Sequence, residues 1–123
     1  MRKEEAKNYR PAFILIDPDH PGTISSRKLV LETAKLNVLT CYSGAEAVAT
    51  LRRFPNVDAI VLNIDVRDME CDEVVRQMKA TAPNVPVILL SPAGHSTNCD
   101  GVDHQLSSYE PQELLALLRK LFG

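Results

Sequence analysis

Five short apolar runs recur along the chain, separated by turn residues and by helical patterns. They read AFILI (12–16), NVLTCY (37–42), VDAIVLN (57–63), VPVILLS (85–91) and, more weakly, VDHQLS (102–107). Runs of this length, rich in Val, Ile and Leu, are typical of strands that are buried on both faces of a sheet. We therefore predict a strand at each of these positions.

Helical periodicity fills most of the remaining chain. The second helical stretch opens with Ser43, and Glu46 follows three residues later, as in a capping box. The last stretch begins with Pro111 and places leucines on one face at helical spacing. The predicted helices cover residues 24–36, 43–54, 72–81 and 111–121.

The alternation of strand and helix predicts an α/β fold, a single doubly wound parallel sheet with helices on both faces. The chain of 123 residues suffices for one domain. We assign residues 1–10 to a polar leader and residues 11–123 to the domain. Ligands of such folds bind beyond the carboxyl ends of the strands, which here means Asp17 to Asp19, Asn63 to Asp65, Ser91 and Ser107–Ser108.

Charge and hydropathy exclude several classes of partner. The net charge is −2, so no basic field points to nucleic acid or to an anionic membrane surface. No apolar run approaches the ~18 residues that a membrane span needs, and the first residues lack the apolar core of a signal peptide. We expect a cytoplasmic protein.

The cysteines and histidines show no metal-binding spacing. Cys41, Cys71 and Cys99 form no CxxC pair and their number is odd, so we expect free thiols in a reducing compartment. Cys41 lies in an apolar alternation and is expected in the core. We interpret His20, His95 and His104 as loop or strand-end residues, and His95 with Cys99 makes only an incomplete zinc site.

Several segments together resemble the receiver domain of two-component response regulators. They are FILIDPD, YSGAEAVATL, VDAIVLNI with Met69-Glu70 beyond it, NVPVILLS and PQELLALLRKL, in this order. The resemblance spans residues 12–121 and implies a five-stranded sheet in the order 2-1-3-4-5. It also implies an acidic pocket that binds Mg²⁺ and accepts a phosphoryl group from a histidine kinase on an aspartate.

The acidic positions of that pocket are partly replaced here. The first acid corresponds to Asp17 and is kept, whereas the second falls on Pro18, with Asp19 one residue later. The phosphoacceptor position falls on Asn63. An amide is not nucleophilic enough to accept a phosphoryl group, and it brings no charge to a metal.

Of the other two positions implied by the resemblance, one is kept and one is replaced. The switch hydroxyl corresponds to Ser91, whereas the lysine corresponds to Ser108, with the family's following proline missing before Tyr109. The family also carries a full helix after the fourth strand, where PAGHSTNCD (92–100) has no helical pattern. We expect this fourth helix to be short or absent, so that a partner must use a remodelled face or another one.

Two functional hypotheses remain open at this stage. The first is a non-enzymatic, phosphorylation-independent interaction module with protein partners, no cofactor, weak or absent Mg²⁺ binding, and a monomeric or weakly dimeric state. The second is a working phosphoacceptor that uses Asp17, Asp19 or Asp65 with Mg²⁺. The first is favoured because Asn63, Pro18 and Ser108 depart from the family together.

Overall fold

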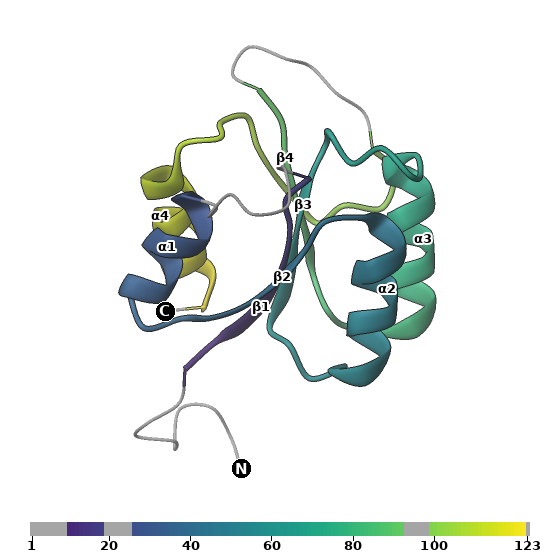
Figure 1. Cartoon of the computed structure of the whole chain (residues 1–123), viewed down its shortest axis with the longest axis horizontal. Coiled ribbons are helices and arrows are strands. Elements are labelled where there is room, and N and C mark those ends of the chain that lie inside the picture. The colour runs from purple at the N-terminus through teal and green to yellow at the C-terminus, as the bar shows by residue number, and fades with distance from the viewer. Residues whose placement is uncertain (1–9, 19–25, 93–98, 123) are drawn as a thin grey trace.

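A parallel sheet of five strands forms the centre of the molecule (Figure 1). The computed structural model describes residues 10–18, 26–92 and 99–122. The strands are β1 (Ala12–Ile16), β2 (Asn37–Cys41), β3 (Ala59–Asn63), β4 (Val87–Leu90) and β5 (His104–Leu106). Their order is β2-β1-β3-β4-β5 and every neighbouring pair is parallel, which confirms the predicted topology.

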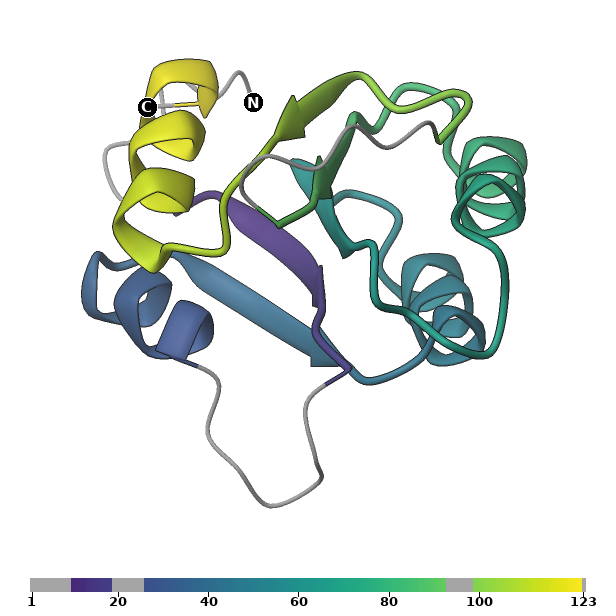
Figure 2. The same cartoon turned by 90° about the horizontal axis from the view of Figure 1, so that it is seen from above.

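Helices cover both faces of this sheet (Figure 2). The described residues form α1 (Ser26–Thr33), α2 (Gly44–Arg53), α3 (Cys71–Thr81) and α4 (Pro111–Phe122). Helices α1 and α4 lie together on one face, and α2 and α3 lie together on the other. The structure thus has the doubly wound architecture that the alternating pattern predicts.

The sheet separates two hydrophobic cores. Residues alternate along β1, so that Ile14 and Ile16 pack toward α2 and α3, whereas Phe13 and Leu15 pack toward α1 and α4. All four side chains are fully buried. Burial on both faces explains why β1 reads as an unbroken apolar run, and each such side chain contributes roughly 1.5–3 kcal/mol to stability.

Helix α1 ends earlier than the sequence pattern predicts. The Leu36 N–H donates to the Leu31 carbonyl and the Lys35 N–H donates to the Glu32 carbonyl, as in a Schellman motif. Lys35 adopts a left-handed conformation with φ of 69°. The backbone therefore leaves the helix before Leu36, although the apolar spacing continues. The predicted strands at 57–63, 85–91 and 102–107 are likewise shorter in the structure, at 59–63, 87–90 and 104–106.

The start of α2 is capped from two sides. The Ser43 hydroxyl accepts from the Glu46 N–H at 3.1 Å, as predicted. The Asp68 carboxylate accepts from the Gly44 and Ala45 N–H groups at 2.8 and 2.9 Å. Burial alone would raise the pKa of Asp68, but these hydrogen bonds outweigh it, and the pKa is lowered. Asp68 therefore ties the β3–α3 loop to α2 and lies outside the predicted pocket.

The connection between β4 and β5 contains no helix in its described residues, 91–92 and 99–103. Four helices thus accompany five strands in the described part of the chain, and α4 occupies the place of the family's last helix. This finding agrees with the predicted loss or shortening of the helix after the fourth strand. Residues 93–98 of the connection, including His95, lie outside the described residues.

The expectation of three free thiols is wrong for two cysteines. Cys71, the first residue of α3, forms a disulfide with Cys99 in the β4–β5 connection, and their Cα atoms lie 5.9 Å apart. The two residues are 28 positions apart, and only the fold brings them together. Cys41 is a buried free thiol, as expected. The inference of a reducing compartment from free cysteines therefore loses its basis.

Within residues 10–18, 26–92 and 99–122, no helix combines the length and the apolar character that crossing a bilayer requires.

Candidate functional site

Three residues chosen from the sequence meet at the carboxyl edge of the sheet. Asp17 follows β1, Asn63 ends β3 and Ser91 follows β4, and these strands are neighbours in the sheet. Their exposed fractions are 0%, 4% and 0%, so the three polar side chains are buried. Such groups need hydrogen-bond partners, and those partners define what the site can do.

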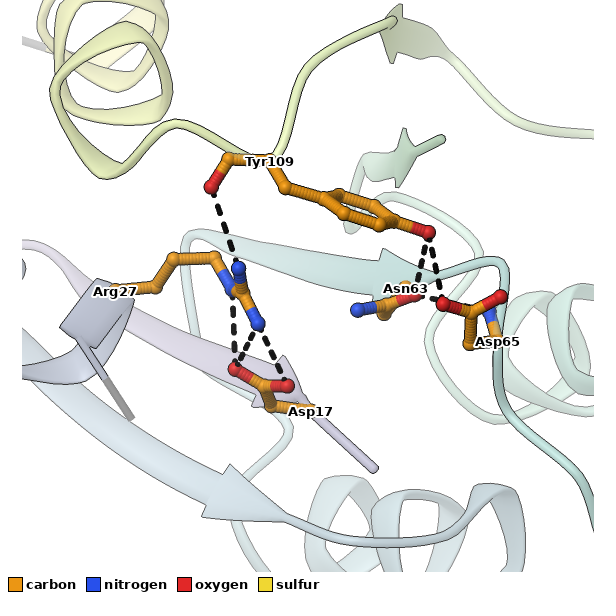
Figure 3. Close-up of polar contacts among 5 residues, drawn as sticks. All are labelled: Asp17, Arg27, Asn63, Asp65 and Tyr109. Atoms are coloured by element: carbon orange, nitrogen blue, oxygen red, sulfur yellow. Dashed lines mark hydrogen bonds and ion pairs between the residues drawn. The ribbon is translucent and has the colours of Figure 1, made fainter. Parts of the chain in front are cut away.

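Asp17 is held by a guanidinium from α1 (Figure 3). Arg27 Nε lies 3.0 Å from Asp17 Oδ2, and Arg27 Nη2 lies 2.8 Å from Oδ1 and 2.7 Å from Oδ2. The Arg27 side chain is 11% exposed and that of Asp17 is fully buried. Both carboxylate oxygens therefore accept from one nearly buried cation, the two-pronged geometry in which arginine binds carboxylates most strongly.

Tyr109 completes the arrangement from the loop after β5. Its carbonyl oxygen accepts from Arg27 Nη1 at 3.2 Å, and the guanidinium carbon lies 5.6 Å from its ring centroid. The phenol oxygen lies 3.1 Å from both Asn63 Oδ1 and Asp65 Oδ2 (Figure 3). Because a phenol has one proton, it donates to one of these oxygens at a time.

The environment keeps the phenol of Tyr109 protonated. Burial raises its pKa, the hydrogen bond and the negative charge of Asp65 raise it further, and the result is a pKa of about 12. The positive charge of Arg27 opposes this shift only in part. At neutral pH Tyr109 is therefore a hydrogen-bond donor, with Asn63 Oδ1 and Asp65 Oδ2 as its two possible acceptors.

Asn63 is fixed from two directions. Its Oδ1 accepts from the Asp65 main-chain N–H at 2.9 Å and faces the Tyr109 hydroxyl. Asp65 itself is exposed and lies in the turn after β3. Its carboxylate faces the same Tyr109 hydroxyl, but from the turn and not from the strand end that Asn63 occupies.

The two serines predicted for the site have different surroundings. The Ser91 hydroxyl is buried within 3.4 Å of Gln105 Nε2, at the same edge as Asn63. Ser108 instead accepts from the Glu110 N–H at 3.1 Å and donates to the Glu113 carboxylate, at the start of α4. For the described residues, no hydrogen bond joins Ser108 to Asp17, Asn63 or Ser91, because its hydroxyl bonds Glu110 and Glu113 instead. Asp19 lies outside the described residues.

Comparison with known families now decides where this fold and site belong. Residues 14–106 match the family described as the response regulator receiver domain. The chain belongs to this family. The resemblance inferred from its segments is thereby confirmed, and the receiver domain extends over most of the chain.

Among curated proteins, the receiver domain is similar to the transcriptional regulatory protein GlrR of Escherichia coli (strain K12). The two are 29% identical over 79 residues, which cover 64% of this chain and 18% of that protein. The match therefore concerns about a fifth of the relative.

Solved structures show the same fold. The receiver domain of sensor histidine kinase PA1611 from Pseudomonas aeruginosa PAO1, with a magnesium ion in its active-site cleft, superposes with a TM-score of 0.77 at 21% identity, covering 91% of this chain and 97% of that chain. CheY of Borrelia burgdorferi, in a complex with CheX, BeF₃ and Mg²⁺, gives a TM-score of 0.76 at 18% identity, with 92% and 90% covered.

The described side chains at this edge of the sheet, as they lie, do not suit a divalent cation. Both oxygens of Asp17 accept from Arg27, and the side-chain oxygen of Asn63 faces Tyr109 and the Asp65 N–H. Mg²⁺ favours carboxylate ligands that are free to coordinate it. No group of three or more metal-ligating side chains occurs among the residues that the structure describes. The positive charge beside Asp17 comes from the chain itself.

Sequence reasoning missed Arg27 and Tyr109. Tyr109 directly follows the Ser107–Ser108 strand end, so the rule that strand ends carry the site could have reached it with one more residue. Arg27 gave a weaker signal, a cation in the first turn of the helix that follows Asp17. Its participation depends on the direction of a long side chain, which spacing alone does not give.

Proposed function

We propose that this receiver domain is a phosphorylation-independent protein-interaction module of a two-component signalling pathway, without enzymatic activity of its own. The observation that carries the proposal is a network of hydrogen bonds among Asp17, Arg27, Tyr109 and Asn63 at the carboxyl edge of the sheet. We call it the closed network. Arg27 holds Asp17 and Tyr109 holds Asn63, so the positions that would bind a metal and a phosphoryl group are engaged within the chain.

The chemistry of Asn63 supports this proposal. Transfer of a phosphoryl group to an aspartate requires a carboxylate nucleophile, and the Asn63 amide supplies none. The transfer also needs cations that balance the negative charge of the moving group. The guanidinium of Arg27 is already neutralised by Asp17, and the position that corresponds to the family's lysine holds Ser108.

Two of the alternative acceptors, Asp17 and Asp65, are less suited to phosphoryl transfer. Asp17 is fully buried, and a phosphoryl donor would have to displace Arg27 to reach its oxygens. Asp65 is exposed, but its carboxylate lies beyond the strand end and contacts the Tyr109 hydroxyl. We therefore include weak or absent Mg²⁺ binding and no stable phosphorylation in the proposal.

Contact with proteins is the activity that remains for such a domain. A receiver-fold relative, CheY of Borrelia burgdorferi, is seen in a complex with the protein CheX. We propose that this domain likewise acts through protein partners, as a monomer or weak dimer. Its net charge of −2 argues against nucleic acid as the partner.

A phosphoryl donor tests the proposal directly. The protein is incubated with acetyl phosphate and Mg²⁺ for intact-mass analysis, and with beryllofluoride and Mg²⁺ for amide NMR. We expect no phosphoryl adduct and no specific shifts around Asp17, Asn63 and Ser91. A receiver domain that carries the acceptor aspartate serves as the positive control. An adduct, or shifts confined to this edge of the sheet, would overturn the proposed function.

A further inference from the structure

A groove of about 630 Å³ lies on the opposite side of the sheet from α1 and α4. One wall is the face of α3 that carries Asp72, Val75 and Arg76, and the other wall is the segment Asp100–Gly101 that leads into β5. In Figure 2 this segment runs beside α3. We call this hollow the α3 groove, and it borders the β4–β5 connection, whose described residues form no helix.

The walls of the α3 groove are fixed to one another. The Cys71–Cys99 disulfide joins them at one end, and an ion pair of 2.6 Å between Lys79 and Asp103 joins them at the other. Between these ties Gly101 has a φ of +89°, and a Cβ added there would lie 2.9 Å from Val75 Cγ1. Glycine therefore permits the close approach of the backbone to the helix.

The charges in the α3 groove are distributed unevenly. Arg76 pairs with Glu73, and Lys79 pairs with Asp103. The exposed carboxylates of Glu70, Asp72 and Asp100 form no ion pair with any described residue. A negative charge near a helix N-terminus interacts favourably with the helix dipole, which accounts for an acidic residue at position 72, in the first turn of α3. It does not account for Asp100, which lies on the opposite wall.

We propose that the α3 groove binds a basic amphipathic segment of a protein partner. An apolar side chain of that segment packs on Gly101 and on the aliphatic stems of Arg76 and Lys79. Its Lys or Arg side chains face the carboxylates of Glu70, Asp72 and Asp100. Charge complementarity selects a basic segment over an acidic one. Because the walls are already joined covalently, little ordering of the groove accompanies binding, which favours affinity.

This inference deepens the proposed function and rests on its premise that the domain works through protein contact. The α3 groove is a different surface from the carboxyl edge of the sheet, where Asp17 and Asn63 lie, so the two proposals can fail separately. A phosphoryl adduct would overturn the proposed function without touching the groove. Partner segments that bind the α1–α4 face would overturn the groove and leave the domain an interaction module.

Selection from a random peptide library on phage tests the α3 groove and does not require that the partner be identified. Peptides enriched on the immobilised domain are synthesised, and their Kd is measured by fluorescence anisotropy for each variant. We expect the enriched peptides to carry Lys or Arg beside Leu, Ile or Phe. We expect Asp72→Lys/Asp100→Lys to weaken their binding at least tenfold, because positive charges on the groove then repel the positive charges of the peptide (on the order of 1.4 kcal/mol or more).

Two further variants keep the result interpretable. Asp72→Asn/Asp100→Asn removes the two charges without reversing them and should weaken binding by a smaller factor. It tests the role of these charges even if the lysine variant folds poorly. Glu32→Lys/Glu110→Lys makes the same charge change at exposed sites beside α1 and α4, and should leave Kd within about twofold. The proposal is overturned if no peptide is enriched, if the enriched peptides are not basic, or if the control variant weakens binding as much as the groove variant.

Discussion

Arg27 compensates a carboxylate that would otherwise be buried at high cost. Removing a charged group from water costs several kcal/mol, and a partner repays this only with good geometry and additional hydrogen bonds. Arg27 has both, because two of its nitrogens reach Asp17 and a third reaches the carbonyl of Tyr109. The residue therefore contributes to the fold and to the closure of the site at once.

Replacement of Arg27 tests its structural contribution. We expect Arg27→Ala to lower the free energy of unfolding by about 3 kcal/mol, because the buried Asp17 loses its guanidinium. The control is Arg76→Ala, which removes an arginine from a pair whose Arg76 side chain is 75% exposed, and it should cost less than about 1 kcal/mol. Urea denaturation at pH 7 measures both. Equal losses in the two variants would contradict a special role for Arg27.

Tyr109 should show its contribution in alkaline solution. Its folded pKa of about 12 lies above the ordinary value of 10.0, so the folded state favours the protonated phenol. The resulting stability is fully present below pH 10 and is lost as the pH rises from 10 toward 12. Tyr109→Phe lacks this contribution and should cost about 1 kcal/mol at pH 7 through its lost hydrogen bonds.

The measurement is the difference in unfolding free energy between the protein and Tyr109→Phe at several pH values. We expect this difference to shrink between pH 10 and pH 12. Tyr42→Phe, at a residue with 42% exposure, serves as the control for general effects of removing a phenol. A difference that stays constant over this range would show that the Tyr109 phenol is not protected by the fold.

At the scale of secondary-structure elements, the disulfide anchors the β4–β5 connection to α3. It joins the first residue of α3 to the β4–β5 connection, so that this connection is anchored although its described residues form no helix. A crosslink across 28 positions restricts the unfolded chain, and such a loop is worth about 3–4 kcal/mol in the chain-entropy description.

Reduction tests this anchoring. We expect a reductant such as TCEP to lower the urea midpoint of the protein, and Cys71→Ser/Cys99→Ser to show the lowered midpoint with or without TCEP. Cys41 provides an internal control, since burial raises the pKa of its thiol and it should resist alkylation in the folded state. An unchanged midpoint after complete reduction would refute the anchoring role.

The elements were predictable because their signals are local. The unbroken runs of β1 and β3 follow from burial on both faces, and the start of α2 follows from Ser43 with Glu46. The exact ends of the elements were less predictable. Helix α1 ends because Lys35 adopts a left-handed backbone conformation, which the spacing of apolar residues does not indicate. The disulfide depends on two segments meeting in space, so the spacing of the cysteines suggested the opposite.

The candidate site was predictable to the extent that it follows from strand ends. Asp17, Asn63 and Ser91 gather as expected because parallel strands end at one edge. Ser108 is at the predicted sequence position, but its hydroxyl accepts from the Glu110 N–H and donates to the Glu113 carboxylate instead. Arg27 and Tyr109 enter the site from a helix and a loop, through side chains whose direction is set by tertiary packing.

For the whole molecule, the closed network predicts indifference to magnesium. Carboxylates that repel one another are stabilised by a bound cation, and the melting temperature then rises with its concentration. Here Arg27 already neutralises Asp17, and Asn63 carries no charge. We expect millimolar Mg²⁺ to leave the melting temperature of the protein unchanged, as measured by calorimetry.

Variants that restore carboxylates to the pocket and remove Arg27 provide the comparison for this prediction. Pro18→Asp/Arg27→Ala/Asn63→Asp should begin from a lower melting temperature and gain several degrees with Mg²⁺, because three carboxylates then face one another without the guanidinium. Asn63→Asp alone should respond little and should not become stably phosphorylated, since Arg27 still holds Asp17. A rise of several degrees for the unaltered protein would contradict the closed network.

The guanidinium of Arg27 differs from a metal ion in one respect that matters to a cell. The occupancy of an ion site follows the concentration of the ion, whereas a group on the chain arrives with every folded copy. If the proposed function holds, we expect the charge balance around Asp17 to be established at synthesis and to be insensitive to free magnesium and to the supply of phosphoryl donors. A protein built in this way would be constitutive, and its signal would be adjusted through the number of molecules made.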